Sequence, residues 1–307
     1  MTASLFTSGL HINLRVLQPV QPAINAATRL CAVYGSPIRH SASPAMHNAA
    51  FAALGLDWRY LAFEVAPESL RDAIAGARAM HFAGINLTVP HKLLAVDMVD
   101  ELKDCAKRWG AVNTIKFETL PGGQVRAVGY NTDADGLASS LRDDLGLDLR
   151  GKKVLLLGAG GAGRTAALKL ASGHVAELFL VNRTQSKVVE IAMEIGKQFP
   201  GVVVHADYPR SAVDLVLNAT SLGLKAEDPS PLDEKQFSLK QTVAVYDMIY
   251  RPAETALLKT ARQAGCRAAN GLGMLLHQGA RAFEIWTGQT APLEVMRRAL
   301  EQNIYGL

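Results

Sequence analysis

Long apolar runs, paired cysteines and a strong excess of one charge are all missing from this sequence, and each absence excludes a class of protein. No apolar run reaches the roughly 20 residues that span a bilayer, which excludes a transmembrane helix. Cys31, Cys105 and Cys266 lie far apart and in no metal-ligand spacing, so we expect reduced packing thiols in a cytoplasmic protein. The histidines form no ligand cluster either, and we expect no metal.

The charge balance points away from large anionic partners. The formal net charge is only +4 at pH 7 and the basic residues are scattered, so we expect neither nucleic-acid binding nor membrane binding. Hydrophobic residues make up 49% and charged residues 20% of the chain, as in folded globular proteins. We expect a small-molecule substrate as the partner, and a monomer or homodimer as the assembly.

The first 29 residues are predicted to be an N-terminal tail. Residues 1–28 contain no acidic residue and show no regular pattern, which is a weak sign of a transit peptide. We expect the tail to be dispensable for the fold.

Short β-rich runs alternate with helical stretches from Leu30 onward, which is typical of an α/β fold. The first runs are residues 31–34, 60–65 and 84–89, with helices beginning at Pro44 and near residue 67 and with Pro90 expected in the first turn of a further helix. Segments 111–117 and 125–130 are joined through a Pro-Gly-Gly turn, which predicts a hairpin and an antiparallel strand in a mixed sheet.

A second α/β series follows a helix predicted at residues 135–145. Its strands are expected at residues 154–158, 177–181, 202–205, 214–218 and 243–247, and two amphipathic helices, 272–286 and 293–302, close the chain. At 307 residues the chain is long enough for two domains. We predict a substrate-binding and catalytic domain of residues 30–131 plus 271–307, on which the final helices pack back, and a Rossmann-like NADP-binding domain of residues 132–270.

A glycine-rich loop lies between an all-apolar strand and a helix, and it consists of Gly158, Ala159, Gly160, Gly161, Ala162 and Gly163. It fits the G-x-G-x-x-G pattern, whose glycines permit a tight turn, the approach of a pyrophosphate and close packing of helix on strand. A helix N-terminus facing the anion adds to binding. We therefore predict a dinucleotide site, with a glycine-rich turn that binds nothing as the alternative.

The choice between NADP and NAD depends on the end of the next strand. NAD enzymes usually carry an acidic residue there for the ribose 2′-hydroxyl, whereas this chain has Asn182, Arg183 and Thr184. Arg183 can bind a 2′-phosphate, and Lys187 lies one helical turn further on. This favours NADP, although Arg183 at an exposed strand end with Thr184 as a helix cap explains the same residues. Residues 218–223 are predicted either to border the cofactor crevice or to form a plain turn.

Lys92 and Asp133 are the candidate reactive pair. The positive end of a helix dipole disfavours a positive charge, so a lysine just after Pro90 is poorly placed for stability alone and is a candidate for proton transfer. Asp133 lies at a strand-to-helix junction. Taken singly, Lys92 is better explained as a solvated surface lysine, and a helix cap explains Asp133 about as well as a catalytic role does. Both follow strands, as do Ser41 and Ser43, so all four residues are expected at one edge of the first domain facing the cofactor.

The two serines differ in their expected roles. Ser43 precedes a proline and resembles a helix N-cap, which leaves Ser41 with the freer hydroxyl. Either serine could bind an anionic or hydroxylated substrate. His47, on the same helix, is expected to be structural.

Taken together, these motifs resemble the shikimate dehydrogenase family from Leu30 to the end of the chain. Besides the glycine-rich loop, they are Ser41-x-Ser43-Pro44-x-x-His47-Asn48, Gly84-x-Asn86-x-Thr88-x-Pro90-x-Lys92, Asn113-Thr114, Gly129-x-Asn131-Thr132-Asp133-x-x-Gly136, Asn182-Arg183-Thr184, Tyr246-Asp247-x-x-Tyr250-x-Pro252 and Asn270-Gly271-Leu272-Gly273-Met274-Leu275-x-x-Gln278-Gly279. The predicted tail is longer than is usual for the family.

The resemblance implies roles for individual residues. Lys92 and Asp133 are the implied catalytic pair. The carboxylated, hydroxylated ring is expected to contact Ser41, Ser43, Thr88, Lys92, Asn113, Asp133, Tyr250 and Gln278. NADP is expected to contact the glycine-rich loop together with Asn182, Arg183, Thr184, Lys187, Met248 and Gly271.

The implied activity is the NADPH-dependent, reversible reduction of 3-dehydroshikimate to shikimate in aromatic amino acid biosynthesis. A quinate dehydrogenase, or a related enzyme that acts on an amino-substituted ring, would use the same pair. A binding protein that keeps the cofactor fold without turnover is the alternative from another class.

Overall fold

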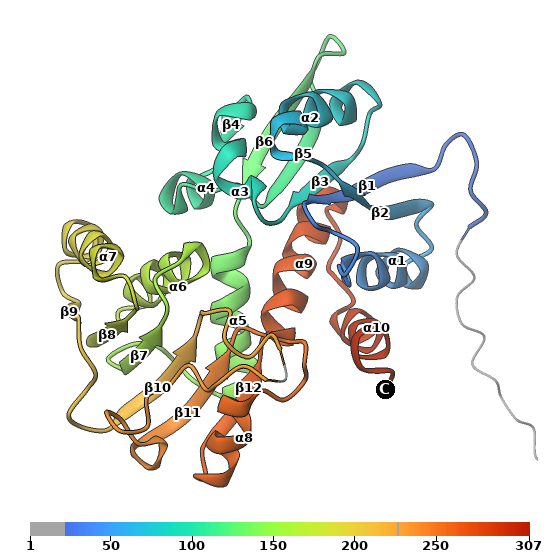
Figure 1. The fold of residues 1–307 in the computed structure, drawn as a ribbon. Coiled ribbons are helices and arrows are strands. Elements are labelled where there is room, and N and C mark those ends of the chain that lie inside the picture. Colours follow the sequence, from blue (N-terminus) through green and yellow to red (C-terminus); the bar gives the residue numbers. More distant parts are fainter. Residues whose placement is uncertain (1–21, 226) are drawn as a thin grey trace, which may run out of the picture.

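The computed structural model describes residues 22–225 and 227–307, and it has two sheets connected by long helices (Figure 1). This confirms the predicted α/β class. Residues 1–21 of the predicted tail lie outside the described residues. Within the described residues, no helix has the length and hydropathy needed to cross a membrane.

The first sheet is mixed. Its strand order is β2 (Trp58–Glu64), β1 (Arg29–Gly35), β3 (Gly84–Leu87), β5 (Thr114–Thr119), β6 (Val125–Tyr130) and β4 (Glu101–Leu102). Strand β1 runs parallel to β2 and β3, whereas β5 is antiparallel to both β3 and β6. The predicted hairpin is therefore confirmed. Gly122 and Gly123 both have positive φ in its turn, a conformation that glycine adopts without strain.

Short helices connect the strands of the first sheet. They are α1 (Ser43–Ala53), α2 (Leu70–Ala79), α3 (His91–Leu94) and α4 (Asp104–Trp109), with 3₁₀ turns η1 (Pro67–Ser69) and η2 (Ala95–Met98). Pro90 was expected inside the first turn of α3, but it lies at the N-cap, one residue earlier. Strand β4 was not predicted, because a two-residue strand leaves no periodicity to read.

The second sheet is parallel throughout. Its strand order is β9 (Val203–His205), β8 (Glu177–Val181), β7 (Lys153–Leu157), β10 (Val213–Asn218), β11 (Thr242–Asp247) and β12 (Arg267–Asn270). Numbered within this sheet, the order is 3-2-1-4-5-6, the order of dinucleotide-binding Rossmann domains. The crevice at the switch point between β7 and β10 is where such sheets bind ligands.

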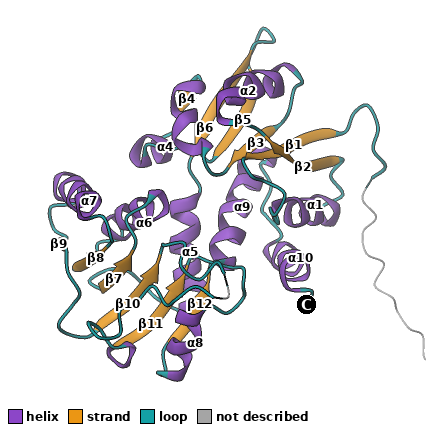
Figure 2. Ribbon diagram, viewed as in Figure 1, coloured by secondary structure: helices purple, strands orange, loops and turns teal. Residues whose placement is uncertain are grey.

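Helices cover both faces of the second sheet (Figure 2). On one face, Val154 and Leu156 of β7 pack with α5 (Asp133–Leu145), α6 (Gly161–Ser172) and α7 (Gln185–Gln198). On the other face, Leu155 and Leu157 pack with α8 (Ala256–Gln263) and with Leu239 of the 3₁₀ turn η3 (Leu239–Gln241). Because both faces are buried, residues 154–157 are all apolar.

The two final helices pack back on the first sheet, which confirms that part of the prediction. Helix α9 (Leu272–Thr287) and helix α10 (Leu293–Tyr305) share a core with β1, β2 and α1. Helices α9 and α10 contribute Leu276, Phe283, Trp286, Met296 and Leu300 to this core. The Trp286 indole nitrogen donates to the Ile115 carbonyl oxygen over 3.0 Å, which attaches α9 to β5.

Strand β1 begins at Arg29, the last residue of the predicted tail. The Arg29 guanidinium lies 4.4 Å from the centre of the Trp58 ring, and its backbone nitrogen donates to the Asp57 carbonyl oxygen. Asn25 and Thr28 also donate to the Asp57 carboxylate, over 3.0 and 2.9 Å. The last residues of the predicted tail are therefore attached to the start of β2.

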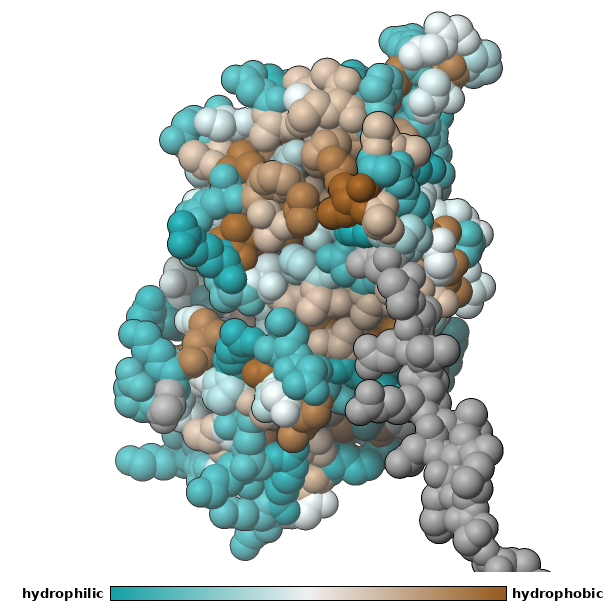
Figure 3. All heavy atoms as spheres, turned by 90° about the vertical axis from the view of Figure 1, so that its right-hand side faces the viewer, coloured by the Kyte–Doolittle hydropathy of each residue, from teal (hydrophilic) through white to brown (hydrophobic). Residues whose placement is uncertain are grey.

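Strand β2 forms one edge of the first sheet and exposes Leu61 and Phe63. Apolar side chains gather in the upper half of the face that Figure 3 presents, which is the right-hand side of Figure 1. Neither Leu61 nor Phe63 lines the cavities described below.

His47 lies at the centre of the packing between α1 and α9. Its imidazole is fully buried, stacks on Tyr60 with 4.3 Å between ring centres, and lies 5.4 Å from the Trp286 ring. Among the described residues, neither ring nitrogen has a hydrogen-bond partner. Burial lowers the pKa of His47 from 6.5 to about 3, so the ring is neutral in the folded protein.

This burial predicts how stability depends on pH. Between pH 6.5 and about 3 the unfolded chain binds a proton at His47 that the folded chain does not bind, so the free energy of unfolding falls as the pH falls. The variant His47→Phe keeps a ring but does not titrate. From pH 7 to pH 5, urea unfolding should show a loss about 2 kcal/mol larger for the wild type than for the variant. Equal losses would contradict the prediction.

Candidate active site

A cavity of about 220 Å³ lies between the two sheets, at the carboxyl ends of β1 and β3. Its lining includes seven of the eight residues predicted to contact the ring: Ser41, Ser43, Thr88, Lys92, Asp133, Tyr250 and Gln278. Met248 and Gly271, which were predicted to contact the cofactor, line it as well. Residues from both halves of the chain therefore meet in one cavity.

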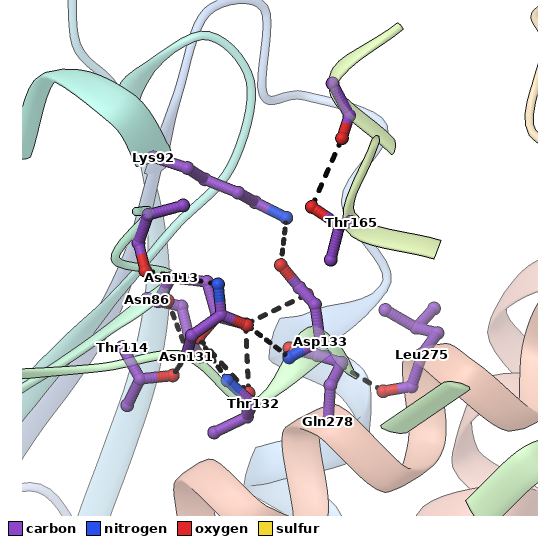
Figure 4. Close-up of polar contacts among 12 residues, drawn as sticks. Asn86, Lys92, Asn113, Thr114, Asn131, Thr132, Asp133, Thr165, Leu275 and Gln278 are labelled. Carbon is purple, nitrogen blue, oxygen red and sulfur yellow. Dashed lines mark hydrogen bonds and ion pairs between the residues drawn. The ribbon is translucent and has the colours of Figure 1, made fainter. Parts of the chain in front are cut away.

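Lys92 and Asp133 form an ion pair in the wall of this cavity (Figure 4). The lysine Nζ donates to Asp133 Oδ2 over 2.8 Å. The aspartate side chain is 11% exposed and the lysine side chain 32% exposed, so the carboxylate is largely withdrawn from water while the ammonium group reaches the cavity. The predicted pair is thus in direct contact.

The helix that carries Lys92 is shorter than the sequence argument assumed. Helix α3 is a single turn, His91–Leu94, so its dipole is small. The Asp133 carboxylate, at 2.8 Å, is the main electrostatic partner of the ammonium group. The backbone at Lys92 is fixed too, because its carbonyl oxygen accepts from the Val112 nitrogen over 2.8 Å.

Asp133 is held by asparagine side chains at the start of α5. Asn113 Nδ2 donates to Asp133 Oδ1 over 2.9 Å, and the Asp133 backbone nitrogen donates to Asn131 Oδ1 over 3.1 Å. Helix α5 begins at Asp133, two residues before the predicted start, with Thr132 at the N-cap. Asp133 Oδ2 is the oxygen that contacts Lys92, so the two carboxylate oxygens have different partners.

Asn113 lies behind the cavity rather than in its lining. It is 2% exposed, and its amide nitrogen donates to both Thr132 Oγ1 and Asp133 Oδ1. Its amide oxygen accepts from the Thr132 backbone nitrogen over 2.8 Å and from Thr114 Oγ1 over 3.0 Å. The structure therefore shows the Asn113 side chain bonded to Thr132, Thr114 and Asp133, and its predicted contact with the ring stays a prediction.

Asn86 lines the cavity, although its position in the sequence predicted no role for it. Its amide nitrogen donates to Thr114 Oγ1 and to the Asn113 carbonyl oxygen, over 2.9 and 3.2 Å. Its amide oxygen accepts from the Tyr60 hydroxyl over 2.6 Å. Asn86 was part of the motif at residues 84–92, but its place at the end of a buried strand gave no signal of function. His40, Met274 and Leu275 line the cavity as well and were also missed.

The two serines lie at the start of α1. Ser43 was expected to be the N-cap, but it is the first helical residue, and Ala42 is the N-cap. The Ser43 backbone nitrogen donates to Ser41 Oγ over 3.4 Å. Ser41 therefore accepts a hydrogen bond at the helix N-terminus, while both serines line the cavity.

Close contact between α5 and α9 places Gln278 opposite the start of α5. A Cβ atom on Gly136 would lie 3.0 Å from both the Cβ and the backbone nitrogen of Gln278, so a glycine lets the helices approach this closely. Gln278 Nε2 donates to the Leu275 carbonyl oxygen over 2.8 Å. The spacing of Asp133 and Gln278 thus depends on the glycine at position 136.

The glycine-rich loop follows β7 and has the geometry of a phosphate-binding turn. Gly158 has a φ of +107°, and a Cβ atom on Gly163 would lie 2.1 Å from the Gly158 carbonyl oxygen. A Cβ atom on Gly160 would meet nothing within 4 Å, so this glycine faces open space. These are the tight turn, the close packing and the open approach that dinucleotide binding needs.

The residues predicted to hold a 2′-phosphate lie beside this loop. Asn182 Oδ1 accepts from the Ala159 backbone nitrogen over 3.1 Å, which attaches the end of β8 to the loop. A groove of about 600 Å³ is lined by Gly158, Gly160, Asn182, Arg183, Thr184 and Lys187, and also by residues 219–222. Residues 219–222 therefore do border the crevice.

A third cavity, of about 260 Å³, joins the two regions. It shares Lys92, Asp133, Met248 and Met274 with the first cavity, and it reaches residues 161–162 of the glycine-rich loop. The remaining lining is mostly apolar, including Val89, Pro90, Leu93 and Leu137. The ion pair therefore lies where the space in front of the glycine-rich loop meets the first cavity.

Buried polar bonds brace the segment that carries Met248 and Tyr250. Asp247 is 0% exposed, and it accepts from Asn218 Nδ2, Thr255 Oγ1 and the Ile249 backbone nitrogen over 2.9, 2.7 and 3.0 Å. Burial raises the pKa of Asp247, although these hydrogen bonds oppose the rise. Burial also raises the pKa of Tyr250.

Three family models match the chain. Residues 33–115 match the shikimate dehydrogenase substrate binding domain, residues 139–223 match shikimate / quinate 5-dehydrogenase, and residues 271–301 match the shikimate 5′-dehydrogenase C-terminal domain.

Whole-chain comparisons agree with these matches. The shikimate dehydrogenase (NADP(+)) of Methanopyrus kandleri is 39% identical over 93% of this chain and 99% of that protein. A crystal structure of a shikimate dehydrogenase in complex with NADP+ has a TM-score of 0.83 and 38% identity, covering 93% of this chain and 99% of that one. The ligand-free 5-ketofructose reductase of Gluconobacter sp. has a TM-score of 0.80 and 34% identity, covering 91% and 99%. The chain belongs to the shikimate dehydrogenase family.

Proposed function

We propose that this protein catalyses the NADPH-dependent, reversible reduction of 3-dehydroshikimate to shikimate, a step of aromatic amino acid biosynthesis. The observation that carries the proposal is the Lys92–Asp133 ion pair, which lies between a small polar-lined cavity and the glycine-rich loop. The relative from Methanopyrus kandleri, named for this activity, supports the choice of substrate.

The two halves of the chain are assigned different tasks. Residues 30–131 and 271–307 bind the ring, and residues 132–270 bind NADP. The ring contacts are Ser41, Ser43, Thr88, Lys92, Asn113, Asp133, Tyr250 and Gln278. The cofactor contacts are residues 158–163 together with Asn182, Arg183, Thr184, Lys187, Met248 and Gly271.

The residues present fit a dinucleotide phosphate. The open space at Gly160 leaves room for a pyrophosphate, and α6 begins at the next residue with its backbone N–H groups at the loop. Arg183 and Lys187 supply positive charge in the same groove, and no acidic residue lies in the described part of its lining. When bound, NADPH supplies the hydride for the ring carbonyl carbon.

The proton comes from the chain itself. The Lys92–Asp133 pair supplies it to the ring oxygen, and the Lys92 ammonium group stabilises the negative charge that develops there. Asp133 holds the ammonium group in place through Oδ2, while Asn113 fixes the other carboxylate oxygen.

The activity is tested by following absorbance at the NADPH band. With NADP+ present, shikimate should be oxidised with a higher kcat/KM than quinate. Because the 5-ketofructose reductase has the same fold at 34% identity, 5-ketofructose with NADPH is the third substrate to compare. A higher kcat/KM for quinate or for 5-ketofructose would show that this compound, and not shikimate, is the preferred substrate. Tight NADPH binding with no turnover of any of the three would indicate a binding protein.

The Lys92→Ala variant tests the proton donor. Its kcat should fall by about 10²- to 10⁴-fold, the usual contribution of general acid catalysis, while NADPH binding should be largely unchanged. Lys169→Ala is a matched control, because Lys169 forms a 3.0 Å ion pair with Asp135 of α5 but lines neither of the two cavities that Lys92 lines. Near-normal turnover in Lys92→Ala would remove Lys92 from its role.

The preference for NADP is assigned to Arg183. Replacing Arg183 with alanine should raise the KM for NADP+ by about tenfold or more, because a charge-assisted bond to the 2′-phosphate is lost. The KM for NAD+, which has no such phosphate, should change little. Parallel changes in both KM values would show that Arg183 supports the loop rather than the phosphate.

Two glycine variants separate binding from folding. Gly160→Ala adds a methyl group in open space, so it should fold normally but weaken NADPH binding. Gly163→Ala places a methyl group against the Gly158 carbonyl, so it should lower the melting temperature as well. Thermal unfolding and NADPH fluorescence titration measure the two effects. Equal melting temperatures for the two variants would contradict this division.

The cytoplasmic location and the choice between monomer and homodimer stay predictions.

A further inference from the structure

Tyr60 lies directly behind the substrate cavity and has no place in the reaction described above. It is 0% exposed and does not line the cavity, yet its hydroxyl bonds to residues that do. The hydroxyl donates to Asn86 Oδ1 over 2.6 Å. A hydrogen bond from Ser43 to the same hydroxyl opposes the rise in the pKa of Tyr60 that burial causes. One phenol thus connects α1 with the end of β3.

The position of this phenol is fixed from several sides. Asn48, on α1, bonds to both backbone groups of Tyr60: its Oδ1 accepts from the Tyr60 nitrogen over 2.9 Å, and its Nδ2 donates to the Tyr60 oxygen over 2.8 Å. The ring stacks on His47 with an interplanar angle of 10°. The hydroxyl therefore has little freedom to move away from Asn86.

The hydrogen bonds of Asn86 leave it one way to contact a ring hydroxyl. Both amide hydrogens are used, by Thr114 Oγ1 and the Asn113 carbonyl oxygen. An amide oxygen has two lone pairs, and Tyr60 occupies one. Asn86 can therefore accept a hydrogen bond from the substrate but has no N–H left to donate, and Tyr60 helps to hold this orientation.

We propose that Tyr60 is a positioning residue that orients Asn86 and Ser43 so that both side chains present acceptor oxygens to the hydroxyl groups of the ring. It acts through these two side chains and does not touch the substrate. The proposal rests on the proposed function, because it assigns Tyr60 to recognition of the same ring.

The test is Tyr60→Phe, which removes the hydroxyl and keeps the ring. The KM for shikimate should rise by about tenfold, since Asn86 loses a donor and Ser43 loses an acceptor. The KM for NADP+ should stay at the wild-type value. Tyr246→Phe is the matched control: Tyr246 is also 0% exposed, and its hydroxyl bonds to Ser140 Oγ over 2.7 Å away from the cavities. It should lose stability without a change in either KM.

A double-mutant cycle with Ser43→Ala tests whether Tyr60 acts through its partners. The two substitutions together should raise the KM for shikimate by less than the product of the single effects. A wild-type KM for shikimate in Tyr60→Phe, an equal rise in both KM values, or simple additivity in the cycle would overturn the proposal. If Tyr60→Phe fails to fold, as judged by circular dichroism, Asn48→Ala replaces it. This variant should also raise the KM for shikimate and leave the KM for NADP+ unchanged. A wild-type chain that does not oxidise shikimate would overturn the proposed function instead, and the inference with it.

Discussion

An ion pair between two residues far apart in the sequence, Lys92 and Asp133, determines how the rest of the site is arranged. The lysine comes from a one-turn helix after β3, and the aspartate begins the long helix α5. Neither residue could hold its position alone, because a long lysine side chain has many rotamers and a largely buried carboxylate needs partners. Asn113 and Asn131 supply those partners for Asp133, and Asn131 in turn donates to the Ala111 carbonyl oxygen, just before β5.

Helix α5 connects this pair to the second half of the molecule. Its first residue lines the cavity between the two sheets, its apolar side packs on the second sheet, and Gly136 lies against Gln278 of α9. The same element therefore places a carboxylate, a glutamine and the cofactor-binding sheet relative to one another. A side chain added at Gly136 would therefore shift all three relative to one another.

Much of this arrangement could be predicted from the sequence, and the part that could not has physical reasons. Strand periodicity and the glycine pattern predicted the α/β class, the hairpin and the phosphate loop, because each depends on residues close in the chain. The Lys92–Asp133 contact was inferred only from the shared position of both residues after strands. Asn86 and Tyr60 were missed because a buried asparagine and a buried tyrosine look like packing residues until their hydrogen-bond partners are known. The start of α5 and the N-cap of α1 were displaced by one or two residues, where side-chain and backbone bonds compete.

The return of α9 and α10 to the first sheet has a consequence for synthesis of the chain. The core around β1 and α1 contains Phe283, Trp286, Met296 and Leu300, so it stays incomplete until residues 283–300 have left the ribosome. The second sheet, by contrast, has all its strands by Asn270. The half that is translated first is therefore the half that can finish folding last, which reverses the usual order of N-terminal domain first.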